Sequence, residues 1–145
     1  MIDPRGPRFA ATITTVVLAV VLVTGSPWLL AVQGVVFGLA VIFGVAASPY
    51  GLLFRRLVRP RIGPPGELES PEPPRFAQAV GLVFTVAGLV GYLSDVTLIA
   101  YIAVGAALAA AFLNAAFGYC LGCEIYLLYR RFFPARTTNT PEVSP

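Results

Sequence analysis

Apolar residues fill two long stretches of the chain. Residues 9–54 contain no charged side chain, and residues 76–123 contain only Asp95. About 20 apolar residues cross a bilayer as one helix, so each stretch predicts a pair of helices joined by a tight turn. The expected fold is therefore an all-α membrane protein with four transmembrane helices, near residues 9–24, 27–48, 76–93 and 96–118.

Small and polar residues mark the two expected turns. Gly25 tolerates a positive φ, Ser26 can cap a new helix and Pro27 suits its first turn. In the second stretch, Ser94 or Asp95 can serve as the N-cap. A signal peptide is the alternative explanation of the first 25 residues. A membrane helix is favoured, because no A-x-A-like cleavage site follows and a second apolar run begins at once.

Composition and charge agree with a membrane protein. Hydrophobic residues make up 57% of the chain and charged residues 12%, against about a quarter charged in ordinary globular chains. All basic residues are arginines, and they lie in the N-terminal tail, the central loop and the C-terminal region. The positive-inside rule then predicts that both termini are cytoplasmic. Membrane topology and contact with the lipid bilayer explain the excess of basic over acidic residues, so nucleic acid is not an expected partner.

A short internal repeat divides the chain. "PRFA" occurs at residues 7–10 and 74–77, and the two units close with "LLFRR" and "LLYRR". Units that begin and end on one side of a membrane are parallel repeats, related by a pseudo-two-fold axis along the membrane normal. The predicted division is a first transmembrane hairpin, a cytoplasmic proline-rich linker, a second transmembrane hairpin with Cys-x-x-Cys, and a disordered tail, at residues 7–56, 57–73, 74–131 and 132–145.

Small residues recur four positions apart along the predicted helices, a spacing that lets helix backbones approach closely in lipid. These residues can pack the two hairpins of one chain together, or they can pack one chain against another. A homo-oligomer is therefore an alternative to packing within one chain. The pairs are Gly34 and Gly38, Ala40 and Gly44, Ala87 and Gly91, and Gly105 and Ala109.

Both cysteines lie near the end of the second unit, in "GYCLGCEIYLLYRR". Aligning the ends of the two units leaves extra residues in the second, and these include Cys120 and Cys123. The cytosol is reducing, so no permanent structural disulfide is expected on that side. Zinc needs about four ligands, whereas the chain has two cysteines and no histidine, so a metal would need a dimer or a partner. No resident metal or cofactor is expected.

Two helix arrangements give the cysteines different reactivity. If the fourth helix runs unbroken through Cys120, the thiols lie near its negative end, and Glu124 disfavours a thiolate. If Gly118 ends that helix, Cys120 begins a new short helix whose amide dipoles favour the thiolate. The unreactive alternative is a pair of buried, small apolar residues.

The chain resembles known families at these motifs. "SPWLL" followed by "GLAVIFGVAASPYGLL" resembles the two-helix membrane domain of bacterial membrane rhodaneses, which carry sulfane sulfur on a cytoplasmic cysteine. Residues 7 to about 131, with the "RFA" starts, the "SP" after the second helix and the late "CLGC", resemble domain-of-unknown-function family 4395. Because these are small bacterial membrane proteins, the resemblance implies a location in the bacterial plasma membrane.

The leading functional hypothesis is thiol redox or sulfur relay on the cytoplasmic side. Cys120 would be the attacking or accepting thiol and Cys123 the resolving thiol, with a thioredoxin-like or rhodanese-like partner. The alternative is a non-catalytic scaffold or assembly subunit of a membrane complex. The other polar positions have structural explanations: a turn cap for Asp95, and interhelical hydrogen bonds for Asn114, Gln33 and Gln78.

Overall fold

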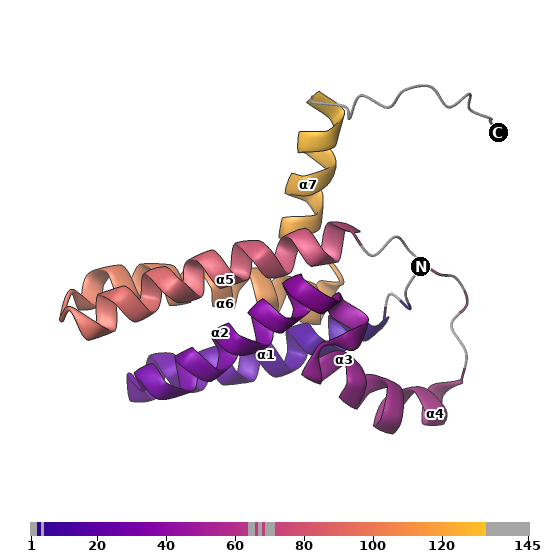
Figure 1. Cartoon of the computed structure of the whole chain (residues 1–145), viewed down its shortest axis with the longest axis horizontal. Helices are drawn as coiled ribbons and strands as arrows, with labels where there is room; N and C mark the ends of the chain where they lie inside the picture. The colour runs from indigo at the N-terminus through magenta and orange to yellow at the C-terminus, as the bar shows by residue number, and fades with distance from the viewer. Residues whose placement is uncertain (1–2, 4, 64–65, 67, 69–71, 133–145) are drawn as a thin grey trace.

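The structure is a computed structural model of the whole chain and describes residues 3, 5–63, 66, 68 and 72–132. Long helices run side by side in it, and no strand occurs among the described residues (Figure 1). These long helices are α1 (Arg5–Thr24), α2 (Pro27–Phe43), α5 (Glu72–Leu93) and α6 (Thr97–Phe117).

Two helical arms leave the bundle at the same end (Figure 1). One arm is α7 (Leu121–Phe132), which stands steeply off the bundle. The other, called the first arm because it comes earlier in the chain, runs almost continuously from Val45 to Ile62. It consists of a 3₁₀ turn (Val45–Ala47), α3 (Pro49–Leu53), a π-helical segment (Phe54–Val58) and α4 (Arg59–Ile62).

The predicted helices are present, but three of them differ at one end. The first begins at Arg5 instead of residue 9, and the third at Glu72 instead of residue 76. The second ends at Phe43, five residues before the predicted end at residue 48, because Gly44 adopts φ 98° and stops the helix. Apolar side chains continue past Gly44, so the hydrophobic pattern did not show this end.

The expected proline-rich linker is partly helical. Its residues 57–62 continue the first arm, since Pro60 stands in the first turn of α4, where proline is tolerated. Gly63, at φ 78°, then ends the arm. Residues 64–65, 67 and 69–71 of the linker, and residues 133–145 of the predicted tail, lie outside the described residues.

The first predicted turn is confirmed, and the cap predicted for the second is wrong. Gly25 has φ 66°, and the Ser26 hydroxyl accepts the N–H of Leu29 at 3.2 Å. At the second turn the N-cap is Val96, which makes no side-chain cap. Asp95 reverses the chain at φ 62°, while the Ser94 hydroxyl donates to the Val90 carbonyl at 2.5 Å.

A buried core joins the long helices. The closest packing is between α1 and α6, α2 and α5, and α5 and α6. The core cluster consists of Leu18, Val21, Leu30, Val104 and Ala107. Since α1 supplies two of these residues, it forms part of the core of the bundle.

A polar contact crosses the buried core at Gln33, which is fully buried. The Gln33 amide donates to the Thr14 hydroxyl at 3.4 Å, and its oxygen accepts the Tyr50 hydroxyl at 2.6 Å. The expected interhelical hydrogen bond of Gln33 is therefore confirmed. It ties α1, α2 and α3 together, because an unpaired amide would be costly in an apolar interior.

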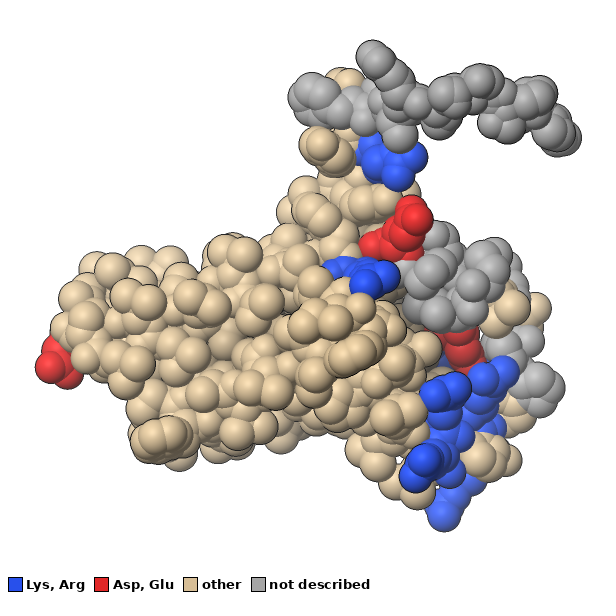
Figure 2. Space-filling model, in the orientation of Figure 1, with Lys and Arg blue, Asp and Glu red and all other residues tan. Residues whose placement is uncertain are grey.

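In the part of the chain that the structure describes, three helices are long and apolar enough to cross a membrane: α1, α5 and α6. The α2 helix is apolar too, with 17 residues. Large apolar side chains on their outer faces are exposed, such as Val23 at 86% and Trp28 at 82%. In the face shown in Figure 2, basic side chains gather toward one end of the bundle and on α7, and the long flank is uncharged as far as an acidic side chain at the opposite tip. This distribution indicates membrane association.

Arg8 and Arg75 each cap a helix of the other hairpin. Arg75 donates to the carbonyls of Val41 and Ile42, near the end of α2, at 2.6 and 2.8 Å. Arg8 donates in the same way to two carbonyls near the end of α6, at 3.2 and 3.3 Å; these belong to Ala115 and Ala116. The last carbonyls of a helix have no partner within it and carry partial negative charge, so a guanidinium there satisfies both needs.

Replacing either cap should destabilise the bundle. We expect Arg8→Gln and Arg75→Gln each to lower the free energy of unfolding by about 1–2 kcal/mol, because two charge-assisted hydrogen bonds are lost. Denaturant unfolding in detergent micelles measures this loss. Arg131→Gln, at the exposed end of α7, is the matched control and should change stability little. Equal effects from all three changes would refute the capping role.

Candidate functional site

Gly118 separates α6 from α7. It has φ 69°, in the left-handed region that glycine adopts without strain, and its N–H donates to the Asn114 carbonyl at 2.9 Å. The next amide, of Tyr119, donates to the Leu113 carbonyl at 3.3 Å. Of the two arrangements left open by the sequence, the structure has the broken one, with the cysteines at the start of a new helix.

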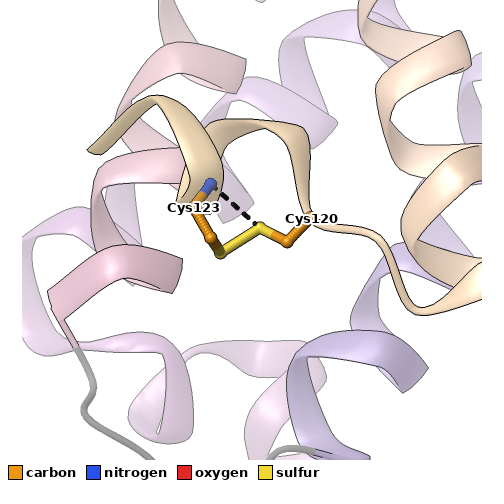
Figure 3. Close-up of a disulfide and its surroundings, with 2 residues drawn as sticks. All are labelled: Cys120 and Cys123. Carbon is orange, nitrogen blue, oxygen red and sulfur yellow. Dashed lines mark hydrogen bonds between the residues drawn. A yellow bond between two sulfur atoms is a disulfide. The ribbon is translucent and has the colours of Figure 1, made fainter. Parts of the chain in front are cut away.

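Cys120 and Cys123 form a disulfide at the N-terminus of α7, with their Cα atoms 5.1 Å apart (Figure 3). The Cys123 N–H donates to the Cys120 sulfur at 3.2 Å, and the Glu124 N–H donates to the Cys120 carbonyl at 3.0 Å. Cys120 therefore stands in the N-cap position of α7. Both cysteines are partly exposed, whereas the unreactive alternative describes them as buried apolar residues.

The first hairpin contains the same capping turn. At the start of α3, the Ser48 hydroxyl accepts the N–H of Gly51 at 3.2 Å, as the Cys120 sulfur accepts the N–H of Cys123. Within their capping turns, Cys120 and Cys123 have the positions that Ser48 and Gly51 have at the start of α3. The alignment of the two units, with extra residues in the second, stays a prediction.

Contacts with α5 hold α7 in place. Gly122 is buried against α5, and a Cβ atom built on it would lie 2.6 Å from the Cβ of Ala77. One turn further along, the rings of Phe76 and Tyr126 have centroids 5.4 Å apart. The Tyr126 hydroxyl donates to a carboxylate oxygen of Glu72 at 3.0 Å. The close approach at Gly122 sets the position of both cysteines, because it lies between them.

Two hollows meet at Cys120. One hollow, of about 300 Å³, has a mixed lining and is called the polar cavity here because two arginines and Asn114 border it. Its lining residues are Arg5, Pro7, Arg8, Pro74, Asn114, Gly118, Cys120 and Cys123. A mainly apolar groove of about 230 Å³ lies between the long helices and α7, and Cys120, Leu121 and Gly122 line it. Cys123 lines only the polar cavity, whereas Cys120 lines both the polar cavity and the groove. The disulfide therefore borders both an arginine-lined hollow and a mainly apolar groove.

The polar cavity is bordered by arginines that already have partners. Arg8 is held by the carbonyl end of α6. Arg5 donates to both carboxylate oxygens of Asp3, at 3.0 and 2.8 Å, and to the Gly63 carbonyl at 2.8 Å. These hydrogen bonds from Arg5, together with the charge of Arg59, hold the pKa of the Asp3 carboxyl below its usual range, although burial opposes the shift.

Asp3 should make the stability of the bundle depend on acid. Its folded-state pKa is lowered, so the unfolded chain binds the proton more readily. The stability from Asp3 is therefore present above the unfolded pKa and is lost as the pH falls through the folded pKa. We expect Asp3→Asn to weaken the fall in melting temperature of the wild-type protein between about pH 5 and pH 2. An equal fall in the wild type and in Asp3→Asn would show that Asp3 is not its cause.

The other predicted polar residues divide between the site and the rest of the fold. Asn114 lines both hollows and Gln78 the groove, whereas Asp95 lies in the turn at the far end. The described residues contain no group of three His, Cys, Asp or Glu side chains able to hold a metal ion. Sequence reasoning did not assign Arg8 to the site. The repeated "PRFA" was the available signal, because it places an arginine at the start of each unit.

Comparisons with known proteins identify a family. The family model described as "Domain of unknown function (DUF4395)" matches residues 2–131. This match confirms the resemblance drawn from the "RFA", "SP" and "CLGC" motifs, and does not test the likeness of each half to membrane rhodaneses. No curated protein and no solved structure matches the chain.

Proposed function

The chain belongs to the DUF4395 family, and we propose that its Cys120 and Cys123 form a reversible dithiol–disulfide pair serving thiol redox or sulfur relay at a membrane surface. The observation that carries this proposal is the capping turn of α7, where the Cys120 sulfur accepts the Cys123 N–H beside an arginine-lined cavity. Reactive cysteines are found in such partly exposed, electropositive places at helix N-termini.

The geometry supports an order of steps. In the reduced pair, the Cys123 amide and the positive end of α7 stabilise a Cys120 thiolate. That thiolate attacks a sulfur of a partner's disulfide, and one partner thiolate leaves. Cys123 then loses its proton and attacks the Cys120 sulfur. The internal disulfide forms, and the second partner thiolate leaves and takes up a proton. Each step is reversible, so a reduced soluble dithiol can return the Cys120–Cys123 disulfide to the dithiol by the same exchanges in the opposite direction.

The membrane arrangement belongs to the same proposal. We infer four spans, with α2 as the shortest, because its 17 residues lie at the lower end of the range of about 17–25 that suffices. The reciprocal caps by Arg8 and Arg75 support the parallel repeat, since a two-fold axis would exchange them. The basic end of the bundle supports a cytoplasmic site, by the positive-inside rule. The proposal sets this site in a bacterial plasma membrane and takes a thioredoxin-like or rhodanese-like protein as the partner.

A redox titration tests the dithiol function. The full-length protein in detergent is equilibrated with graded ratios of reduced and oxidised glutathione and quenched with a maleimide that adds mass. We expect one cooperative two-electron transition, at a potential above about −300 mV, because stable structural disulfides lie below that value. Cys120→Ser/Cys123→Ser should show no transition. A folded protein whose disulfide resists every glutathione ratio would refute the proposal.

A non-catalytic scaffold is the second candidate. Its support is that Gly38 and Gly105 face open space, with no atom within 4 Å of an added Cβ, so a second helix can approach them closely. Such a scaffold would bind a membrane partner or another copy of the chain. Crosslinking in membranes distinguishes the two functions, because a scaffold should recover the same partner in the Cys120→Ser/Cys123→Ser variant.

A further inference from the structure

We propose that the apolar groove beside Cys120 binds a membrane quinone, and that the reduced cysteine pair transfers its two electrons to it. This inference rests on the proposed dithiol function and names the electron acceptor of the same site. Its basis is the position of one redox-active sulfur at the junction of an apolar groove and a polar cavity.

The groove has the shape and lining for an apolar ring. It measures about 230 Å³ and exists because α6 carries alanines along this face, namely Ala106, Ala107, Ala110 and Ala111. Ala106 is exposed, so the groove reaches the outer face of the bundle, where a bilayer would lie. The other end is bordered by Cys120 and Gly122. A carrier that diffuses in lipid can therefore reach Cys120 without entering the polar cavity.

Two side-chain amides give the groove hydrogen-bonding groups, which a lipid tail would not need. Asn114 and Gln78 line it among apolar neighbours, and both are partly buried. An amide NH₂ can donate to a carbonyl oxygen, which a quinone ring presents and a hydrocarbon chain does not. Ligand sites are typically apolar, with a few placed polar groups. The amides, together with the adjacent disulfide, select an oxygen-bearing redox ring as the occupant.

The two cysteines border different compartments. Cys123 lines only the polar cavity, which suits exchange with a soluble thiol, and Cys120 lines both hollows. The pair thus lies between a water-soluble electron donor and a lipid-soluble acceptor. A dithiol that is reduced repeatedly by a soluble partner needs such an acceptor to return to the disulfide.

The transfer balances in atoms and electrons. The Cys120 thiolate adds to a ring carbon of the quinone and forms a carbon–sulfur bond. Cys123 loses its proton and attacks the Cys120 sulfur, so the disulfide forms as the carbon–sulfur bond breaks. Its electron pair passes to the ring. The two protons released by the thiols complete the quinol, and a soluble dithiol then reduces the disulfide by exchange.

Quinone reduction by the reduced protein tests the proposal. The full-length protein in detergent is reduced with a dithiol, desalted without oxygen and mixed with a short-chain benzoquinone. Quinone absorbance and alkylatable thiols are followed together. We expect one quinone to disappear for each cysteine pair oxidised. Ala110→Phe, which fills the groove, should slow the reaction roughly tenfold or more. Ala109→Phe, on the exposed face of the same helix, should not.

Glutathione exchange separates the failure of this inference from the failure of the dithiol function. Normal exchange without quinone reduction overturns the quinone assignment and leaves the dithiol intact, whereas loss of both activities overturns both. Equal quinone rates in Ala110→Phe and wild type place the reaction outside the groove and overturn the assignment. If Ala110→Phe does not fold, Asn114→Ala serves instead. It should raise the quinone concentration needed for half-maximal rate several-fold, and no change would overturn the assignment.

Discussion

The Cys123→Ser variant is expected to trap a mixed disulfide through Cys120, and the Cys120→Ser variant is not. Cys120 accepts an amide hydrogen bond at the N-terminus of α7, so its thiolate is the stabilised one and attacks first. Without Cys123, nothing resolves the adduct. Incubation with an oxidised soluble dithiol protein, followed by non-reducing electrophoresis, should show adduct formation at least about tenfold faster for Cys123→Ser.

Two outcomes bear on this asymmetry. The double variant, Cys120→Ser/Cys123→Ser, is the control and should form no adduct. Equal trapping by the two single variants would show that the capping turn does not distinguish the sulfurs, and the assigned order of attack would then be wrong. Faster trapping by Cys120→Ser would reverse the roles of the two cysteines.

Gly122→Ala should be the most damaging single methyl addition near the site. The added Cβ would lie 2.6 Å from the Cβ of Ala77 and 2.7 Å from its Cα, so α7 must move away from α5. Overpacking of this kind costs about 1–3 kcal/mol. Because Gly122 lies between the two cysteines, the shift should also change the rate at which Cys120 is alkylated in the reduced protein. Thermal unfolding in detergent and alkylation kinetics measure the two effects.

Gly38→Ala is the matched control, since its added Cβ has no atom within 4 Å. Alanine also favours a helix over glycine by up to about 1 kcal/mol, so this variant should be as stable as the wild type or more stable. If Gly122→Ala were equally stable and its cysteine equally reactive, the close packing of α7 on α5 would not position the site.

Much of the fold could be predicted because its signals are local. A long uncharged run predicts apolar helices wherever it occurs, and the turn at Gly25 and Ser26 follows from backbone freedom and one hydroxyl. The cap predicted for the second turn was wrong, because Asp95 adopts the left-handed conformation and Val96 takes the N-cap position. The predicted end of α2 was wrong because Gly44 stops the helix within an apolar run.

The candidate site was only half predictable. The spacing of Cys120 and Cys123 was visible, and so was the possible break at Gly118. The likeness to the Ser48 capping turn was not visible, because it consists of two hydrogen bonds from a backbone N–H to a side-chain oxygen or sulfur, which the sequence does not show. The role of Arg8 was missed for a related reason: its acceptors lie more than a hundred positions away along the chain.

By itself, the sequence determined the helical class, the long apolar helices, the repeated arginine motif and the family. These depend on side-chain type and on neighbours within a few residues. Only the tertiary structure decided which helix each arginine caps, that α7 leaves the bundle at Gly118, and that Cys120 borders two hollows. The physical reason is that these features arise between segments far apart in the chain, where the packing of whole helices sets the distances.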